Sequence, residues 1–150
     1  MKQDQQKLIK LSKNSFKKTA EELDILESSE DKVVYALDET GVGVESENYR
    51  CWSEVGVPPI LEKNGSHEKV NLIGSTTILN EYHTVIDVYE NQTINSDKII
   101  NHLSYLIELN PNKHVVVYMD NATTHTSKKT QAFCEENKDA LTIIYLPSVL

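Results

Sequence analysis

Cysteine and long apolar runs are both scarce in this chain of 150 residues. Cys51 and Cys134 are the only cysteines and form no CxxC pair, so neither a disulfide framework nor a zinc site is indicated. No apolar stretch approaches the roughly 20 residues that a membrane-spanning helix needs. The N-terminus, rich in Lys and Gln, also lacks the apolar segment of a secretory signal. These absences predict a cytoplasmic protein that has no membrane partner.

Positive charge is also in short supply. The formal net charge of −8 argues against a free-standing DNA-binding domain, which normally carries a basic face. Residues 1–18 are the exception, with six lysines against one aspartate, before the sign reverses over residues 21–31. Such a basic arm can lie along phosphates, but a solvated amphipathic helix is the favoured interpretation. We expect residues 1–30 to form a helical lead-in and residues 31–150 to form one domain.

The apolar periodicity changes along the chain. The first half has β-rich runs separated by turn residues, which predict an antiparallel meander, and the second half alternates helical periods with continuous apolar runs. The expected elements are strand 32–38, a turn over 40–43, a short strand 49–52, strands 69–79 and 82–89, a helix from Asn95 or Ser96 to Asn110, strand 114–119, helix 127–137 and strand 141–146. Trp52 is expected to anchor the packing of its short strand, and strand 114–119 to be covered on both faces.

This order of elements predicts a mixed sheet with helices on its faces. Its parallel part should begin where the helices begin, because parallel strands need a crossover. Asp38 and Asp120 follow two of the apolar runs. If those two strands are neighbours, the acids emerge side by side at one edge of the sheet. Two such carboxylates would form a binding site for a divalent cation, as in many phosphodiester-cleaving enzymes.

Each of these residues has a simpler local interpretation. Asp38 could cap the structure that follows it, and Glu39 and Asn121 could be turn residues. His125 could serve the start of a helix or the packing of the core. The remaining histidines show no ligand spacing, and no role is assigned to them.

Five motifs occur in the order seen in mariner-like bacterial insertion-sequence transposases, which belong to the DDE superfamily of endonucleases. The resemblance covers roughly residues 30–148. The motifs are Asp38-Glu39-Thr40-Gly41-Val42, the stretch from Arg50 to Pro58, the stretch from Val70 to Ser75, Met119-Asp120-Asn121-Ala122-Thr123-Thr124-His125, and Tyr145-Leu146-Pro147-Ser148. The resemblance implies an α/β, ribonuclease H-like fold and a catalytic core that cuts and rejoins DNA at the element ends.

The resemblance also implies roles for single residues. Asp38 would bridge two divalent cations, Mg²⁺ or Mn²⁺, and Asp120 would hold one of them from the neighbouring strand. Glu39 and Asn121 would support these ligands by hydrogen bonding. His125 would orient a phosphate or a group that supports the ligands.

The third acid of the family is missing from this chain. It would follow the Leu-Pro pair on a final helix, but only three residues follow Pro147. Glu135, Glu136 and Asp139 belong to the preceding helix and its turn, so none is well placed to substitute. The lead-in is also too short for the helix-turn-helix domains of the family. We therefore expect a core that is truncated at both ends, lacks the final helix, and is inactive as an isolated fragment.

Partners and alternatives follow from this expectation. An active complex would contain DNA, a homodimer of the core, and a polypeptide that supplies the missing part, in the nucleoid of the cytoplasm. The main alternative is a non-catalytic remnant that acts as a dimerisation or regulatory module, or is inert. A phosphohydrolase with Asp38 as nucleophile ranks low, because that class needs a second Asp where Thr40 stands.

Overall fold

A computed structural model of the chain describes residues 31–43, 52–57, 60, 65–78 and 82–146. Within these ranges the elements are β1 (Lys32–Gly43), β2 (Lys69–Thr77), β3 (Thr84–Glu90), α2 (Ser96–Leu109), β4 (His114–Met119), α3 (Lys128–Glu136) and β5 (Leu141–Tyr145). The helical lead-in expected over residues 1–30 lies outside the described residues. None of the described helices is long and apolar enough to cross a membrane.

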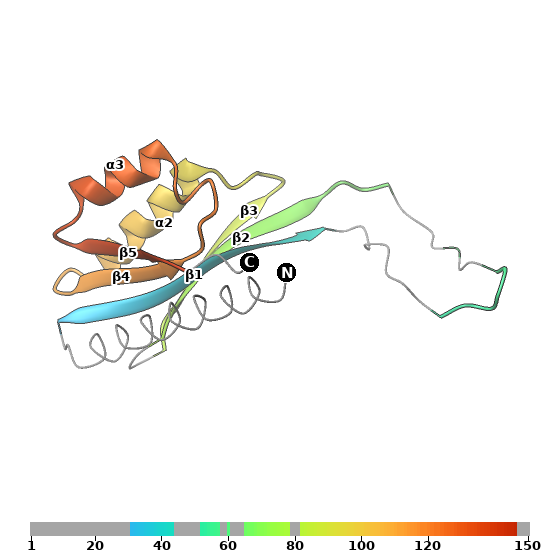
Figure 1. Cartoon of the computed structure of the whole chain (residues 1–150), viewed down its shortest axis with the longest axis horizontal. Coiled ribbons are helices and arrows are strands. Elements are labelled where there is room, and N and C mark those ends of the chain that lie inside the picture. The colour runs from blue at the N-terminus through green and yellow to red at the C-terminus, as the bar shows by residue number, and fades with distance from the viewer. Residues whose placement is uncertain (1–30, 44–51, 58–59, 61–64, 79–81, 147–150) are drawn as a thin grey trace, which may run out of the picture.

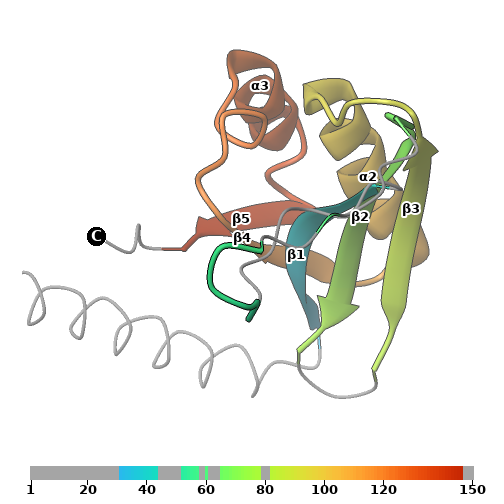
Figure 2. The same cartoon turned by 90° about the vertical axis from the view of Figure 1, so that its right-hand side faces the viewer.

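The strands form one mixed sheet in the order β3-β2-β1-β4-β5. β1 pairs antiparallel with β2, and β2 with β3, whereas β4 pairs parallel with both β1 and β5. The meander followed by a parallel part is the arrangement that the sequence predicts. The described helices α2 and α3 lie on the same face of the sheet (Figures 1 and 2).

The apolar run of β4 and the capping residues of the two helices correctly predict where the elements in the second half of the chain begin. Strand β4 has the predicted bounds. Helix α2 begins after Asn95, whose side chain accepts a hydrogen bond from the Lys98 amide, so this Asn acts as an N-cap. Helix α3 begins after Ser127, whose side chain accepts a hydrogen bond from the Thr130 amide. Capping residues therefore set both helix starts.

The predicted turn over residues 40–43 is wrong. β1 continues to Gly43 and pairs with β2 over its whole second half, where Gly41 lies opposite Asn71. A Cβ at Gly41 would stand 2.7 Å from the Asn71 side-chain oxygen. The glycine therefore allows a close approach between two strands, and the pairing with β2 keeps the backbone extended.

The expected packing role of Trp52 is also wrong. Trp52 lies outside any strand and is fully exposed, at 103%. The other residues of the short strand predicted over 49–52 lie outside the described residues. The aromatic ring therefore buries no area against the sheet.

Strand β4 is buried on both faces, as its unbroken apolar sequence predicts. Val115, Val117 and Met119 join the main core cluster under the helices. Val116 and Tyr118 join a second cluster on the opposite face, with Val34 of β1. The strand thus forms the centre of the core.

A buried chain of polar side chains ties α2 to the antiparallel part of the sheet. Nε2 of His102 lies 2.5 Å from Oγ of Ser75, and its Nδ1 lies 2.8 Å from Oδ2 of Asp87. His102 is fully buried and Ser75 is 2% exposed. Both ring nitrogens therefore have partners, as buried polar groups require. No sequence pattern had indicated this contact.

We expect His102→Ala to lower the free energy of unfolding by about 2–4 kcal/mol, because it leaves a cavity and removes the partner of the buried Ser75 hydroxyl. Asn101→Ala, at an exposed position of the same helix, should change it by less than about 0.5 kcal/mol. Urea unfolding followed by circular dichroism measures both. Equal stability of the two variants would contradict a structural role for His102.

Candidate functional site

The parallel register of β1 and β4 brings the two acidic motifs to one end of the sheet. Ala36 lies opposite Tyr118. Two residues further along each chain come Asp38, still within β1, and Asp120, the first residue after β4. The two strands that carry Asp38 and Asp120 are therefore neighbours, as the prediction of a shared cation site required. Asp38 therefore lies within the paired part of β1, and Asp120 lies at the end of the neighbouring strand β4.

Asp38 and Glu39 lie on opposite faces of the sheet, because successive side chains of a strand alternate. Tyr35 and Leu37 of β1 pack in the core under the helices, so Glu39 shares their face. Asp38 lies on the other face and is exposed. Its Oδ1 accepts a hydrogen bond from the Glu39 amide, at 2.9 Å.

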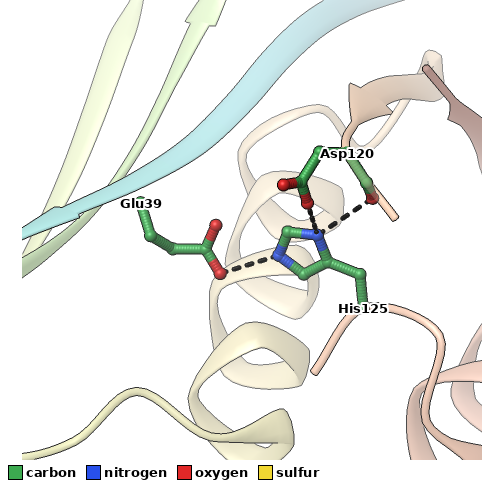
Figure 3. Close-up of side chains that lie close together, drawn as sticks. All are labelled: Glu39, Asp120 and His125. Atoms are coloured by element: carbon green, nitrogen blue, oxygen red, sulfur yellow. Dashed lines mark hydrogen bonds and ion pairs between the residues drawn. The ribbon is translucent and has the colours of Figure 1, made fainter. Parts of the chain in front are cut away.

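His125 joins the two motifs (Figure 3). Its Nε2 lies 2.7 Å from Oε1 of Glu39, and its Nδ1 lies 2.8 Å from Oδ1 of Asp120. The same Nδ1 lies 3.1 Å from the Asp120 carbonyl oxygen. The imidazole is fully buried, whereas Asp120 keeps 61% of its side chain exposed. One buried ring therefore cross-links β1 to the loop after β4.

The loop that carries His125 is held by several hydrogen bonds. The Asp120 Oδ1 accepts from the Ala122 amide at 2.9 Å, and the His125 amide donates to the Ala122 carbonyl at 3.0 Å. The Tyr145 hydroxyl donates to the His125 carbonyl at 3.0 Å. Asn121 donates to the Leu146 carbonyl at 2.6 Å and so ties the loop to the chain just after β5. The loop conformation thus depends on local and distant contacts together.

The surroundings of His125 favour its charged form. Burial lowers the pKa of the ring, but the hydrogen bond and charge of Glu39, with those of Asp120, raise it more, so the pKa lies above its ordinary value. Both ring nitrogens face oxygen acceptors, and only the imidazolium can donate from both. The arrangement therefore stabilises a protonated ring between two carboxylates.

Glu39, Asp120 and His125 each offer a ligand atom, and these atoms lie within 4.8 Å of one another. Asp38 is outside this group, because it lies on the other face of β1. The structure thus brings Glu39 and His125, which the sequence marked only as supporting residues, into direct contact across 86 positions. The only sequence signal for this pair was a histidine five residues after Asp120.

Comparisons with known proteins define the class of the chain. Residues 33–150 match the family of DDE superfamily endonucleases, and the chain belongs to that family. No curated protein matches the chain.

Solved structures of the Mos1 mariner transposase share the fold. The Mos1 strand transfer complex is 16% identical with a TM-score of 0.58, over 95% of this chain and 42% of that one. The Mos1 paired-end complex with Mn is 18% identical with a TM-score of 0.56, over 95% and 43%. The Mos1 catalytic domain is 16% identical with a TM-score of 0.51, over 92% and 59%. The ribonuclease H-like fold is thereby confirmed, and the chain spans less than two thirds of these proteins.

The cross-link through His125 should make stability depend on pH. Because the pKa is higher in the folded state, the stabilisation is complete below the unfolded value of about 6.5 and is lost as pH rises through the folded pKa. In a buffer with chelator, we expect His125→Gln to lower the free energy of unfolding by about 1–3 kcal/mol at pH values below the folded pKa of His125. The difference from the wild type should be smaller above that pKa. Urea unfolding across the pH range measures this difference.

The matched control is His114→Gln, at the opposite end of β4, which should keep the pH dependence that His125→Gln loses. Identical pH profiles for the wild type and His125→Gln would contradict the cationic cross-link.

Proposed function

We propose that this chain is the catalytic core of a mariner-like insertion-sequence transposase, which cleaves DNA strands at element ends and joins them to a target in a metal-dependent reaction. The observation that carries the proposal is the parallel register of β1 and β4, in which Asp38 and Asp120 each follow the last pair, Ala36 and Tyr118, by two residues. Membership of the DDE superfamily endonucleases supports it. The Mos1 structures include paired-end complexes with Mn and with Mg and a strand transfer complex.

Asp38 and Asp120 are the residues that would hold Mg²⁺ or Mn²⁺. Carboxylate oxygens are the ligands that these cations prefer. In both acids Oδ1 accepts a hydrogen bond from a backbone amide, that of Glu39 or of Ala122, and both side chains are exposed. A pair of bound cations would lower the pKa of the attacking hydroxyl and neutralise the leaving oxygen.

The neighbouring residues would position these ligands. His125 fixes the rotamer of Asp120 through Oδ1, and Glu39 holds the other side of the same ring. Asn121 keeps the loop against the end of β5. A ligand whose own orientation is set by buried contacts loses little entropy when it binds a cation, and this favours tight, well-ordered binding.

The full reaction would require partners. DNA supplies the element ends and the target, and a homodimer would synapse two ends. The third carboxylate of the family would lie outside residues 1–150, in this protein or in a partner polypeptide; Glu135 and Glu136 belong to α3 and Asp139 to the turn after it. The active complex would work in the nucleoid. A non-catalytic module for dimerisation or regulation is the second candidate, and it would need no third acid.

Metal binding distinguishes the two candidates. We expect titration calorimetry to show that the wild type binds Mn²⁺ or Mg²⁺ and that Asp38→Asn weakens binding by roughly tenfold or more. Asp139→Asn, an exposed acid in the turn before β5, should bind like the wild type. Unchanged binding by Asp38→Asn would count against the catalytic assignment and in favour of a non-catalytic module.

Cleavage tests the need for a third acid. With two carboxylates the cations are poorly positioned, and positioning supplies most of such a rate enhancement. We therefore expect the 150-residue chain alone to show little or no cleavage of element-end DNA with Mg²⁺ or Mn²⁺ in a gel assay. Robust cleavage that Asp38→Ala abolishes would show that the chain is sufficient.

A further inference from the structure

Gly74 lies in the interior of β2, directly opposite Asp38 in the antiparallel register. Glycine weakens the interior of a strand, because it loses much backbone freedom on folding and has no side chain to pack. A glycine at this place therefore needs a physical reason. Residues opposite each other in such a pair have Cβ positions about 4.5–5.5 Å apart, so any side chain at position 74 would stand beside that of Asp38.

The described fold supplies no internal reason for this glycine. Gly74 is not among the glycines with positive φ, which are Gly56 and Gly65. A Cβ at position 74 would meet no described atom within 4 Å, whereas one at Gly41 would meet Asn71 at 2.7 Å. Gly41 is thus explained by packing within the sheet. Gly74, by contrast, is a strand glycine that no contact among the described residues explains.

Among the described residues, the space beside Gly74 is unfilled and has a defined border. Because Gly74 pairs with Asp38, while the neighbouring Leu37 and Ile73 pack in the core under the helices, this space lies on the face of the sheet turned away from α2 and α3. On one side is the exposed carboxylate of Asp38, and on the other is Ile86 of β3, which pairs with Gly74. Ile86 and Val88 are 58% and 59% exposed. Position 74 is therefore a gap in the layer of side chains on this face, between the carboxylate of Asp38 and the apolar side chains of Ile86 and Val88.

We propose that Gly74 keeps this gap open for the sugar–phosphate backbone of the DNA strand that is cut at Asp38. The inference rests on the proposed function. A strand glycine without an internal role marks the close approach of another backbone or ligand. The apolar edge of a deoxyribose fits against Ile86, and its phosphate faces Asp38. Because phosphate and carboxylate repel each other, this approach requires a divalent cation between them.

A side chain at position 74 should then separate folding from DNA binding. Valine is a better strand residue than glycine, so Gly74→Val should unfold at the same or a higher temperature than the wild type. It should nevertheless lower the Mg²⁺-dependent affinity for DNA by roughly tenfold or more, because the branched side chain fills the gap. Gly74→Ala should have a smaller effect in the same direction.

The experiment measures binding to a short fluorescein-labelled DNA duplex by anisotropy, at low salt, with Mg²⁺ and with chelator. Thermal unfolding of each variant is recorded in parallel. Thr84→Ile is the matched control, because it adds bulk on the same face two strands away from Asp38 and should bind DNA like the wild type. Asp38→Asn tests the proposed function and should lose the Mg²⁺-dependent part of the affinity.

The outcomes separate the two proposals. If Asp38→Asn loses the Mg²⁺-dependent binding but Gly74→Val binds like the wild type, the role of Gly74 is overturned and the proposed function stands. If Gly74→Val is less stable, or changes oligomeric state while still binding DNA, the glycine serves the fold or a protein contact, and the inference is again wrong. If the wild type shows no Mg²⁺-dependent binding, the proposed function fails and the role of Gly74 with it.

Discussion

The parallel pairing of β1 with β4 is the constraint on which the rest of the structure depends. It exists because β4 is apolar along its length and can be buried on both faces, between two core clusters. The pairing requires a crossover, which α2 provides by packing over the sheet. The same register sets where Asp38 and Asp120 lie relative to each other. Core packing and the candidate site are thus consequences of one pair of strands.

Two buried histidines extend this arrangement to the helix-covered face. His102 connects α2 with β2 and β3, and His125 connects β1 with the loop after β4. In each case both ring nitrogens contact side-chain oxygens; His102 has one carboxylate partner and His125 has two. The face turned away from the helices differs, because it carries the exposed Asp38 opposite Gly74 as well as the second core cluster. Within the described residues, both histidine cross-links thus lie on the helix-covered side of the sheet.

Sequence patterns predicted the parts of the fold that depend on local chemistry. The apolar run of β4, the caps Asn95 and Ser127, and the alternation of helix and strand all act within a few residues. The end of β1 was misjudged because Gly41 indicates a turn in isolation, whereas pairing with Asn71 keeps it in the strand. The contact between His125 and Glu39 could not be predicted, because it joins residues 86 positions apart through the tertiary fold.

Ser75, His102 and Asp87 form a chain of hydroxyl, imidazole and carboxylate in the order found in serine hydrolases. A search for active sites that compared only interatomic distances with a hydrolase template would report a nucleophile here. The hydroxyl of that nucleophile belongs to a residue that is 2% exposed, so an ester or amide could not reach it. In this protein, solvent access distinguishes a structural tether from a catalytic triad with the same connectivity.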